Sequence, residues 1–341
     1  MMKTINLLFL GAAILFLLSC ANKKNDIILP KSANTSEADF RAAPIMDSVC
    51  GNYNPDATTS NIYNTFCVRY FKGVERRPLI ITFHGGSYVG GNKEQFNLPL
   101  TIGKRFPVLL TTEDLDNNKF AYACANYRLL EDGNGLTIID CLNDCKMFVE
   151  YMRDNADKYN IDPDKIILMG YSGGAGSSLW IGLRNNFISN VTIKGIVTFD
   201  AQATMNILEW RDQVFAPVGL GGAYEEKVVK PTLESPDLTT TLKLYYNTAL
   251  PSKINKYSAD NKLSLFNLFD SSDPELYMSC QAPYEDFTHH PAHTGALNAR
   301  SKAAGHKSRI QYVKHPSEGP SAPFINPNYE SLIQFFVRKF Q

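Results

Sequence analysis

The sequence lacks an excess of charge of either sign, because 34 lysine and arginine residues balance 34 aspartate and glutamate residues. Proteins that bind nucleic acid usually carry a basic surface, so we do not expect a nucleic-acid partner. The sequence also lacks a CxxC pair or a His-Cys cluster with zinc spacing, and we expect neither a metal ion nor an organic cofactor. Its 341 residues are 44% apolar, which is ample for the core of one large α/β domain.

Long apolar runs are also scarce near the amino terminus. Residues 7–18 are apolar, but a comfortable transmembrane helix needs roughly 20 such residues. Lys3 supplies a positive charge before this run, which is the layout of a signal peptide. We therefore expect residues 1–19 to direct export and not to belong to the fold.

The signal-like segment ends in Leu17-Leu18-Ser19-Cys20, which resembles the bacterial lipobox. This resemblance implies cleavage before Cys20 and acylation of its thiol, and an ordinary secretory signal with an incidental cysteine is the alternative. Several acyl chains would anchor the protein stably to a bacterial membrane, at the periplasmic face or the cell surface. Residues 20–45 are polar and without periodicity, so they are predicted to tether a domain that spans residues 46–341.

Export changes the expected state of the remaining cysteines. Cys50 and Cys67 flank a loop rich in Gly, Asn, Pro and Ser, and they could form a disulfide in an oxidising compartment. Cys124, Cys141 and Cys145 are expected to be small buried core residues.

The chemistry of the sequence centres on residues 165–176, KIILMGYSGGAG. A run of buried β-type residues is followed by Ser172 between glycines and then by a helical segment, which fits the GxSxG nucleophile elbow. Such a turn exposes the serine hydroxyl above the edge of a sheet. It also points the amide of Gly173 and the positive end of the helix toward a developing oxyanion.

A second glycine-rich segment follows an earlier apolar strand at 78–83. It reads His84-Gly85-Gly86-Ser87-Tyr88-Val89-Gly90-Gly91. Adjacent glycines after a central strand let backbone amides converge, as an oxyanion hole requires. We therefore expect the amides of Gly85 and Gly86 to act with that of Gly173.

Alternating strand and helix patterns predict the fold class. Strands are expected at 78–83, 120–127, 165–169, 193–199, 263–269 and 308–314, with helices near 138–156, 175–183 and 329–340. This alternation predicts an α/β protein with a mostly parallel sheet covered by helices on both faces.

HGGSYVGG, NYRL and IDPDKIILMGYSGG together resemble the α/β-hydrolase fold, in particular carboxylesterases of the hormone-sensitive-lipase and feruloyl or acetyl-xylan esterase type. The resemblance is dense from about 78 to 200 and thinner beyond. It implies that Ser172 is the nucleophile, that Gly85, Gly86 and Gly173 supply the oxyanion amides, and that His84 is structural. Residues 203–262 are long for a connection, so we expect them to form an insertion that lines the substrate pocket.

The acid of a catalytic triad is expected after the penultimate strand, which the pattern places at 263–269. Asp273 lies a few positions past this strand and directly precedes Pro274, so it fits the position implied by the resemblance best. Asp270 is the second choice, and Asp200 at the end of the preceding strand is the third.

The histidine departs from the pattern that the resemblance implies. A His-Gly pair is expected after the strand at 308–314, but Pro320 falls near that position and cannot act as a base. His315 is the nearest candidate. His289 and His290 are the alternatives, and the absence of a catalytic histidine also remains open.

Two functions from different classes follow. In the first, the protein is a serine carboxylesterase in which Ser172 attacks an acyl ester, a histidine transfers its proton and Asp273 orients that histidine. Polysaccharide or small-molecule esters are the expected substrates. In the second, a catalytically inactive hydrolase fold serves as a surface binding protein. The sequence gives no indication of the oligomeric state.

Overall fold

The computed structural model describes residues 46–54, 62–73, 75–101, 109–130, 135–184, 186–234, 242–283, 285–306, 308–313, 324–325, 328 and 330–341. The predicted signal peptide, Cys20, the tether and the candidate His315 lie outside these residues. Within the described residues, no helix combines the length and the apolar character that a membrane crossing demands.

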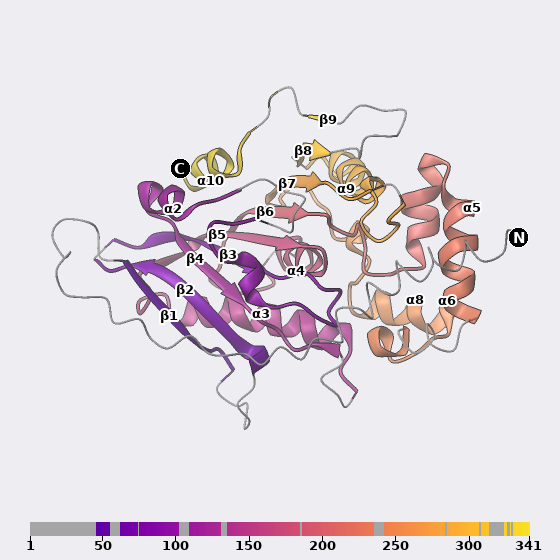
Figure 1. Cartoon of the computed structure of the whole chain (residues 1–341), viewed down its shortest axis with the longest axis horizontal. Coiled ribbons are helices and arrows are strands. Elements are labelled where there is room, and N and C mark those ends of the chain that lie inside the picture. Colours follow the sequence, from indigo (N-terminus) through magenta and orange to yellow (C-terminus); the bar gives the residue numbers. More distant parts are fainter. Residues whose placement is uncertain are drawn as a thin grey trace, which may run out of the picture.

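One sheet organises the molecule. Its nine strands are β1 (Met46–Asn52), β2 (Thr65–Phe71), β3 (Arg77–Phe83), β4 (Ala121–Ala125), β5 (Ile161–Tyr171), β6 (Ile193–Phe199), β7 (Glu275–Cys280), β8 (Ser308–Val313) and β9 (Phe324–Ile325). Their order in the sheet is β1-β2-β4-β3-β5-β6-β7-β8-β9 (Figure 1). Strands β3 to β8 pair in parallel, whereas β1, β2 and β9 pair antiparallel at the two margins. The mostly parallel sheet agrees with the prediction.

Helices follow the strands as the sequence pattern indicates. They are α2 (Thr112–Asn118), α3 (Ile138–Asp154), α4 (Gly173–Gly182), α5 (Gly221–Tyr224), α6 (Lys230–Glu234), α8 (Pro251–Asp260), α9 (Pro291–Ala303) and α10 (Leu332–Phe340). Figure 1 shows α5, α6 and α8 beyond the arrowheads of the central strands, so the predicted insertion stands at the carboxyl edge of the sheet.

The sheet is buried on both faces, because alternate residues of its strands enter two separate cores. Leu79 and Phe83 of β3 pack with side chains of α3, α4 and α9 on one face. Ile80, between them in sequence, packs on the other face with Leu115 of α2 and Phe335 of α10. This double burial explains why the strand sequences are continuously apolar.

The predicted strand at 263–269 is wrong. Residues Leu265–Asn267 form a short 3-10 helix, and the strand that pairs with β6 is β7, several residues farther along. The apolar side chains of Leu263 and Leu265 are buried, but they are buried in a connection. A short apolar run predicts burial more securely than it predicts a strand. Strand β7 begins with the charged residue Glu275, so the sequence pattern did not indicate a buried strand there.

Five cysteines of the predicted domain adopt the expected states. Cys50 of β1 and Cys67 of β2 lie opposite each other in register and form a disulfide. Cys124, Cys141 and Cys145 are buried free thiols.

Candidate active site

Ser172 occupies a strained turn between β5 and α4. Its φ of 52° and ψ of −120° belong to the nucleophile-elbow conformation, and the residue is only 2% exposed. A Cβ added at Gly170 would lie 2.1 Å from the carbonyl oxygen of Gly174, and one at Gly174 would lie 2.0 Å from that of Phe83. Both flanking glycines are therefore required by contact with backbone, which explains the GxSxG spacing.

The hydroxyl of Ser172 meets a histidine from the loop between β7 and α9. Ser172 Oγ lies 2.8 Å from His289 Nε2, and His289 Nδ1 lies 2.8 Å from Asp286 Oδ2. The same carboxylate accepts the backbone N–H of Thr288 at 3.0 Å and that of His289 at 3.3 Å through Oδ1. The turn thus fixes the carboxylate, the carboxylate fixes the imidazole, and the imidazole faces the serine.

Among the residues that the sequence offered, the structure brings His289 to Ser172 and leaves Asp273 away from it. Asp273 immediately precedes β7, whereas Ser172 follows β5. Since β5, β6 and β7 are parallel, the two residues lie at opposite edges of the sheet. The assignment of Asp273 as the acid was wrong because it depended on the misplaced strand. Asp286, which the sequence reasoning missed, contacts the imidazole instead.

The other candidate acids and bases form hydrogen bonds to nearby backbone groups. Asp270 lies in the same distant loop as Asp273 and donates its N–H to Asp273 Oδ2 at 2.6 Å. His290 is the amino-terminal cap of α9, and its Nδ1 accepts the N–H of Ala292 at 3.0 Å. Asp200 is buried after β6, where its Oδ1 accepts the N–H of Gln281 at 2.7 Å.

The glycine loop after β3 lies beside the elbow, but one predicted donor is already engaged. The amide of Gly85 donates to Gln95 Oε1 at 3.0 Å, so its N–H is not free for an oxyanion. Gly173 is the first residue of α4, where an amide has no intrahelical acceptor. A Cβ added at Gly173 would lie 3.5 Å from Ser87 N, which places a further amide of the loop beside this helix start. The geometry favours the amides of Ser87 and Gly173 over that of Gly85, and the role of Gly86 stays a prediction.

His84 is part of the scaffold of this loop, as expected. It is 1% exposed, and its Nδ1 lies 2.8 Å from the carbonyl oxygen of Gly85. Its ring stacks on Tyr127 with centroids 4.1 Å apart. Burial lowers the pKa of His84 to about 4, so the ring stays neutral and holds the loop without charge.

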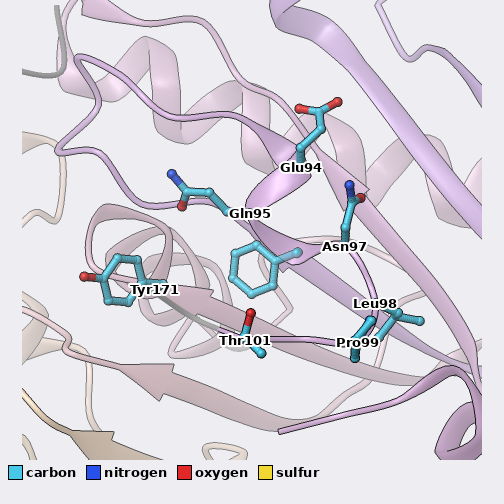
Figure 2. A pocket seen from close by; sticks show the side chains of 8 residues that line it. Glu94, Gln95, Asn97, Leu98, Pro99, Thr101 and Tyr171 are labelled. Atoms are coloured by element: carbon cyan, nitrogen blue, oxygen red, sulfur yellow. The ribbon is translucent and has the colours of Figure 1, made fainter. Parts of the chain in front are cut away.

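A pocket of about 490 Å³ opens next to the elbow. Figure 2 shows Gln95 and Tyr171 on one side of it and Asn97, Leu98 and Pro99 on the other. Tyr171 directly precedes Ser172, and its ring is nearly parallel to that of His289, with centroids 6.2 Å apart. The lining is completed by Glu94, Phe96 and Thr101, so this pocket is formed by residues 94–99, Thr101 and Tyr171 and not by the insertion at 203–262.

Residues of the insertion at 203–262 nevertheless contact the glycine loop and the elbow helix α4. The hydroxyl of Tyr245 donates to the carbonyl oxygen of Ser87. A Cβ added at Gly176 of α4 would lie 3.2 Å from Met205 Cε, so Met205 covers the elbow helix. Within the described residues, no three His, Cys, Asp or Glu side chains form a group that could hold a metal ion. The chemistry available from these residues is nucleophilic attack by a serine with an adjacent base.

Comparison with protein families gives one match. The family model described as BD-FAE matches residues 71–227, which include the glycine loop, the elbow and α4. Comparison with curated proteins found no match.

Solved structures resemble the chain over most of its length. Esterase 2 of Thermogutta terrifontis phosphonylated by sarin has 15% identity and a TM-score of 0.56, covering 85% of this chain and 91% of its own. A truncated carbohydrate esterase from gut microbiota has 16% identity and a TM-score of 0.53, covering 86% and 96%. An inhibited esterase B from Lactobacillus rhamnosis has 13% identity and a TM-score of 0.52, covering 91% and 84%. Together with the parallel sheet and the elbow, these similarities show that the chain has the α/β-hydrolase fold.

Proposed function

We propose that the protein is a serine carboxylesterase that hydrolyses acyl esters through an acyl-enzyme intermediate. The observation that carries this proposal is the chain of two 2.8 Å contacts from Ser172 through His289 to Asp286. A nucleophile, a base and an orienting acid within hydrogen-bond reach are what serine hydrolysis needs.

Each residue has a defined task in the proposed reaction. His289 Nε2 takes the proton of Ser172 as Oγ attacks the ester carbonyl, and it then gives that proton to the leaving alcohol. Asp286 holds the imidazole in the tautomer with hydrogen on Nδ1 and stabilises the imidazolium. The amides of Gly86, Ser87 and Gly173 stabilise the oxyanion. Water activated by His289 then hydrolyses the acyl-enzyme.

The proposed substrates are acyl esters of polysaccharides or of small hydroxylated molecules. The pocket beside Tyr171 supports this choice, because an aromatic ring, the amides of Gln95 and Asn97 and the hydroxyl of Thr101 suit a sugar-like alcohol. One similar structure is described as a carbohydrate esterase, which agrees with that chemistry. Thioesters and lactones would use the same catalytic residues.

We further propose that the protein is exported and lipid-anchored through Cys20. The support is the charged, apolar and LLSC sequence of residues 1–20 and the disulfide between Cys50 and Cys67, which suits an oxidising compartment. Radiolabelled palmitate should be incorporated into the wild-type protein in a bacterial host and not into Cys20→Ala.

Labelling with a fluorophosphonate probe tests the activity without knowledge of the substrate. Wild type should be labelled, whereas Ser172→Ala and His289→Ala should not be. His290→Asn is the matched control, because it changes the neighbouring histidine and keeps a side chain able to cap α9. A folded wild type that neither reacts with the probe nor hydrolyses p-nitrophenyl acetate would refute the esterase and support the inactive binding protein.

A further inference from the structure

The acid and the base of the site come from one short segment. Asp286 and His289 are three residues apart in the loop between β7 and α9. A shift of this loop relative to β5 would move both groups away from Ser172 together. The contacts that attach the loop to the rest of the site therefore control the geometry of the whole triad.

Gln202 joins this loop to the serine itself. It follows β6, and its Nε2 donates to the carbonyl oxygen of Thr288 at 3.1 Å. The same nitrogen lies 3.5 Å from Ser172 Oγ. The two hydrogens of one amide group are thus directed at the triad loop and at the nucleophile.

His293 makes a second connection between the same two segments. Its Nδ1 accepts the N–H of Ala203 at 3.1 Å, and its Nε2 donates to the carbonyl oxygen of Phe287 at 3.0 Å. The residue is fully buried, and burial lowers its pKa to about 3. Only the neutral tautomer with hydrogen on Nε2 makes both bonds, so the connection is intact at neutral pH.

Packing completes the attachment. The ring of Phe287 packs against those of Phe215 and Tyr224, at centroid distances of 5.1 and 5.6 Å. The thiol of Cys280 contacts the carbonyl oxygen of His289 at 3.3 Å. The loop is therefore held on its backbone and on its apolar side, and of these attachments the one through Gln202 also contacts Ser172 Oγ.

We propose that Gln202 is a further catalytic residue, which donates a hydrogen bond to Ser172 Oγ while the serine proton passes to His289, and that His293 is a positioning residue for the same loop. This proposal rests on the proposed esterase function. At 3.5 Å the contact is long for a ground-state hydrogen bond. While its proton passes to His289, Oγ carries partial negative charge until that charge moves to the carbonyl oxygen of the ester, and hydrogen bonds to a more negative acceptor are shorter and stronger. The interaction therefore strengthens in the transition state, which is the condition for an effect on kcat.

Substitution of Gln202 gives a specific kinetic signature. Gln202→Leu keeps the size of the side chain and removes both donors, and it should lower kcat for p-nitrophenyl acetate roughly 10- to 100-fold with KM nearly unchanged. The rate of fluorophosphonate labelling should fall by a similar factor. Gln202→Glu places a carboxylate beside the imidazole, so the acid limb of the pH profile of kcat/KM should move to higher pH.

Gln213→Leu is the matched control, because Gln213 is exposed and contacts Arg300 away from the site. Its kcat should equal that of wild type. His293→Phe should lower kcat and increase hydrogen exchange in residues 285–290, as Gln202→Leu should, because each variant loses an attachment of the loop.

Two results would overturn the proposal. One is an active enzyme whose kcat stays within about twofold of wild type in Gln202→Leu, and the other is a rise in KM at constant kcat, which would mark a substrate contact. An inactive and unlabelled wild type would instead refute the esterase function. Hydrogen exchange tests whether Gln202 and His293 hold the loop even if the protein is inactive. Unchanged exchange at residues 285–290 in both Gln202→Leu and His293→Phe would refute that positioning role.

Discussion

A serine, a histidine and an aspartate gather at each end of β7, and only one set is arranged for catalysis. At the carboxyl end, His289 joins Asp286 through Nδ1 and Ser172 through Nε2. At the amino end, Ser301 Oγ lies 2.6 Å from His306 Nδ1, but His306 Nε2 donates to the carbonyl oxygen of Pro274 at 2.8 Å. The carboxylate of Asp273 accepts the N–H of Asp270 instead.

The difference lies in how the groups are connected. At the amino end each polar atom of His306 is satisfied by its own neighbourhood, so the imidazole has no nitrogen left for an acid or a substrate. At the carboxyl end the imidazole links an acid to a serine in a strained turn, beside the amides that begin α4. The residue types are alike at the two ends, and the hydrogen-bond connections distinguish the structural cluster at the amino end from the catalytic arrangement at the carboxyl end.

The largest expected effect comes from removing each histidine in turn. His289→Ala should lower kcat for p-nitrophenyl acetate by roughly 10⁴- to 10⁶-fold, because the serine loses its base. His306→Ala removes a buried ring and its hydrogen bonds, so it should lower stability by about 1–3 kcal/mol while kcat per folded molecule stays unchanged. Kinetics combined with urea unfolding would show both. Equal losses of kcat in the two variants would remove the distinction between the two ends.

The two aspartates provide a smaller and more conservative test. Asp286→Asn should lower kcat on the order of 10³- to 10⁴-fold, since the amide no longer holds the imidazole in the reactive tautomer. Asp273→Asn should leave kcat at the wild-type value. If Asp273→Asn were the inactive variant, the acid would be the one that the sequence pattern indicated, and the loop at 285–290 would have to rearrange during catalysis.

The fold and the nucleophile were predictable because their signals are local. The strands β3, β5 and β6 each contain a run of apolar, buried residues, and contacts of Gly170 and Gly174 with backbone leave no alternative to glycine around Ser172. The apolar strands and the glycine-flanked serine each depend on residues adjacent in sequence, so a single sequence is enough to predict them.

The acid and the base were harder to predict because they depend on where β7 lies. Glu275 begins that strand, and its charge is compensated by Arg309 and Arg338, which are distant in sequence. The sequence does not reveal this ion pairing, so the apolar run at 263–269 was predicted to be the strand. The choice of Asp273 as the acid depended on that prediction. One local signal was present: Asp286 and His289 have the spacing of a side-chain pair within one turn, just after the buried segment ELYMSC.

The contributions of the two ends of β7 to stability should change with pH in opposite directions. At the carboxyl end the relevant group is His293. Burial lowers the pKa of His293 to about 3, below its ordinary value near 6.5. The unfolded chain therefore binds a proton there that the folded chain does not. This contribution to stability is fully present above pH 6.5 and is lost as the pH falls, by up to about 1.4 kcal/mol per pH unit. Urea unfolding from pH 7 to 5 should show a shallower decline in His293→Phe than in wild type. Parallel declines would contradict a buried neutral His293.

The cluster at the amino end of β7 should lose stability as the pH rises. Burial raises the pKa of Asp273 from 3.8 to about 7. A carboxyl group whose folded pKa is raised contributes stability that is present below the unfolded pKa and is lost as the pH rises through the folded value. Asp273→Asn keeps an oxygen that accepts the N–H of Asp270 and removes the ionisation. It should match wild type near pH 4 and exceed its free energy of unfolding by up to about 4 kcal/mol at pH 8. A stability difference that did not grow between pH 4 and 7 would show that the carboxyl group is ionised in the folded protein. The amino end would then contain a buried charge that no ion pair of the described residues compensates.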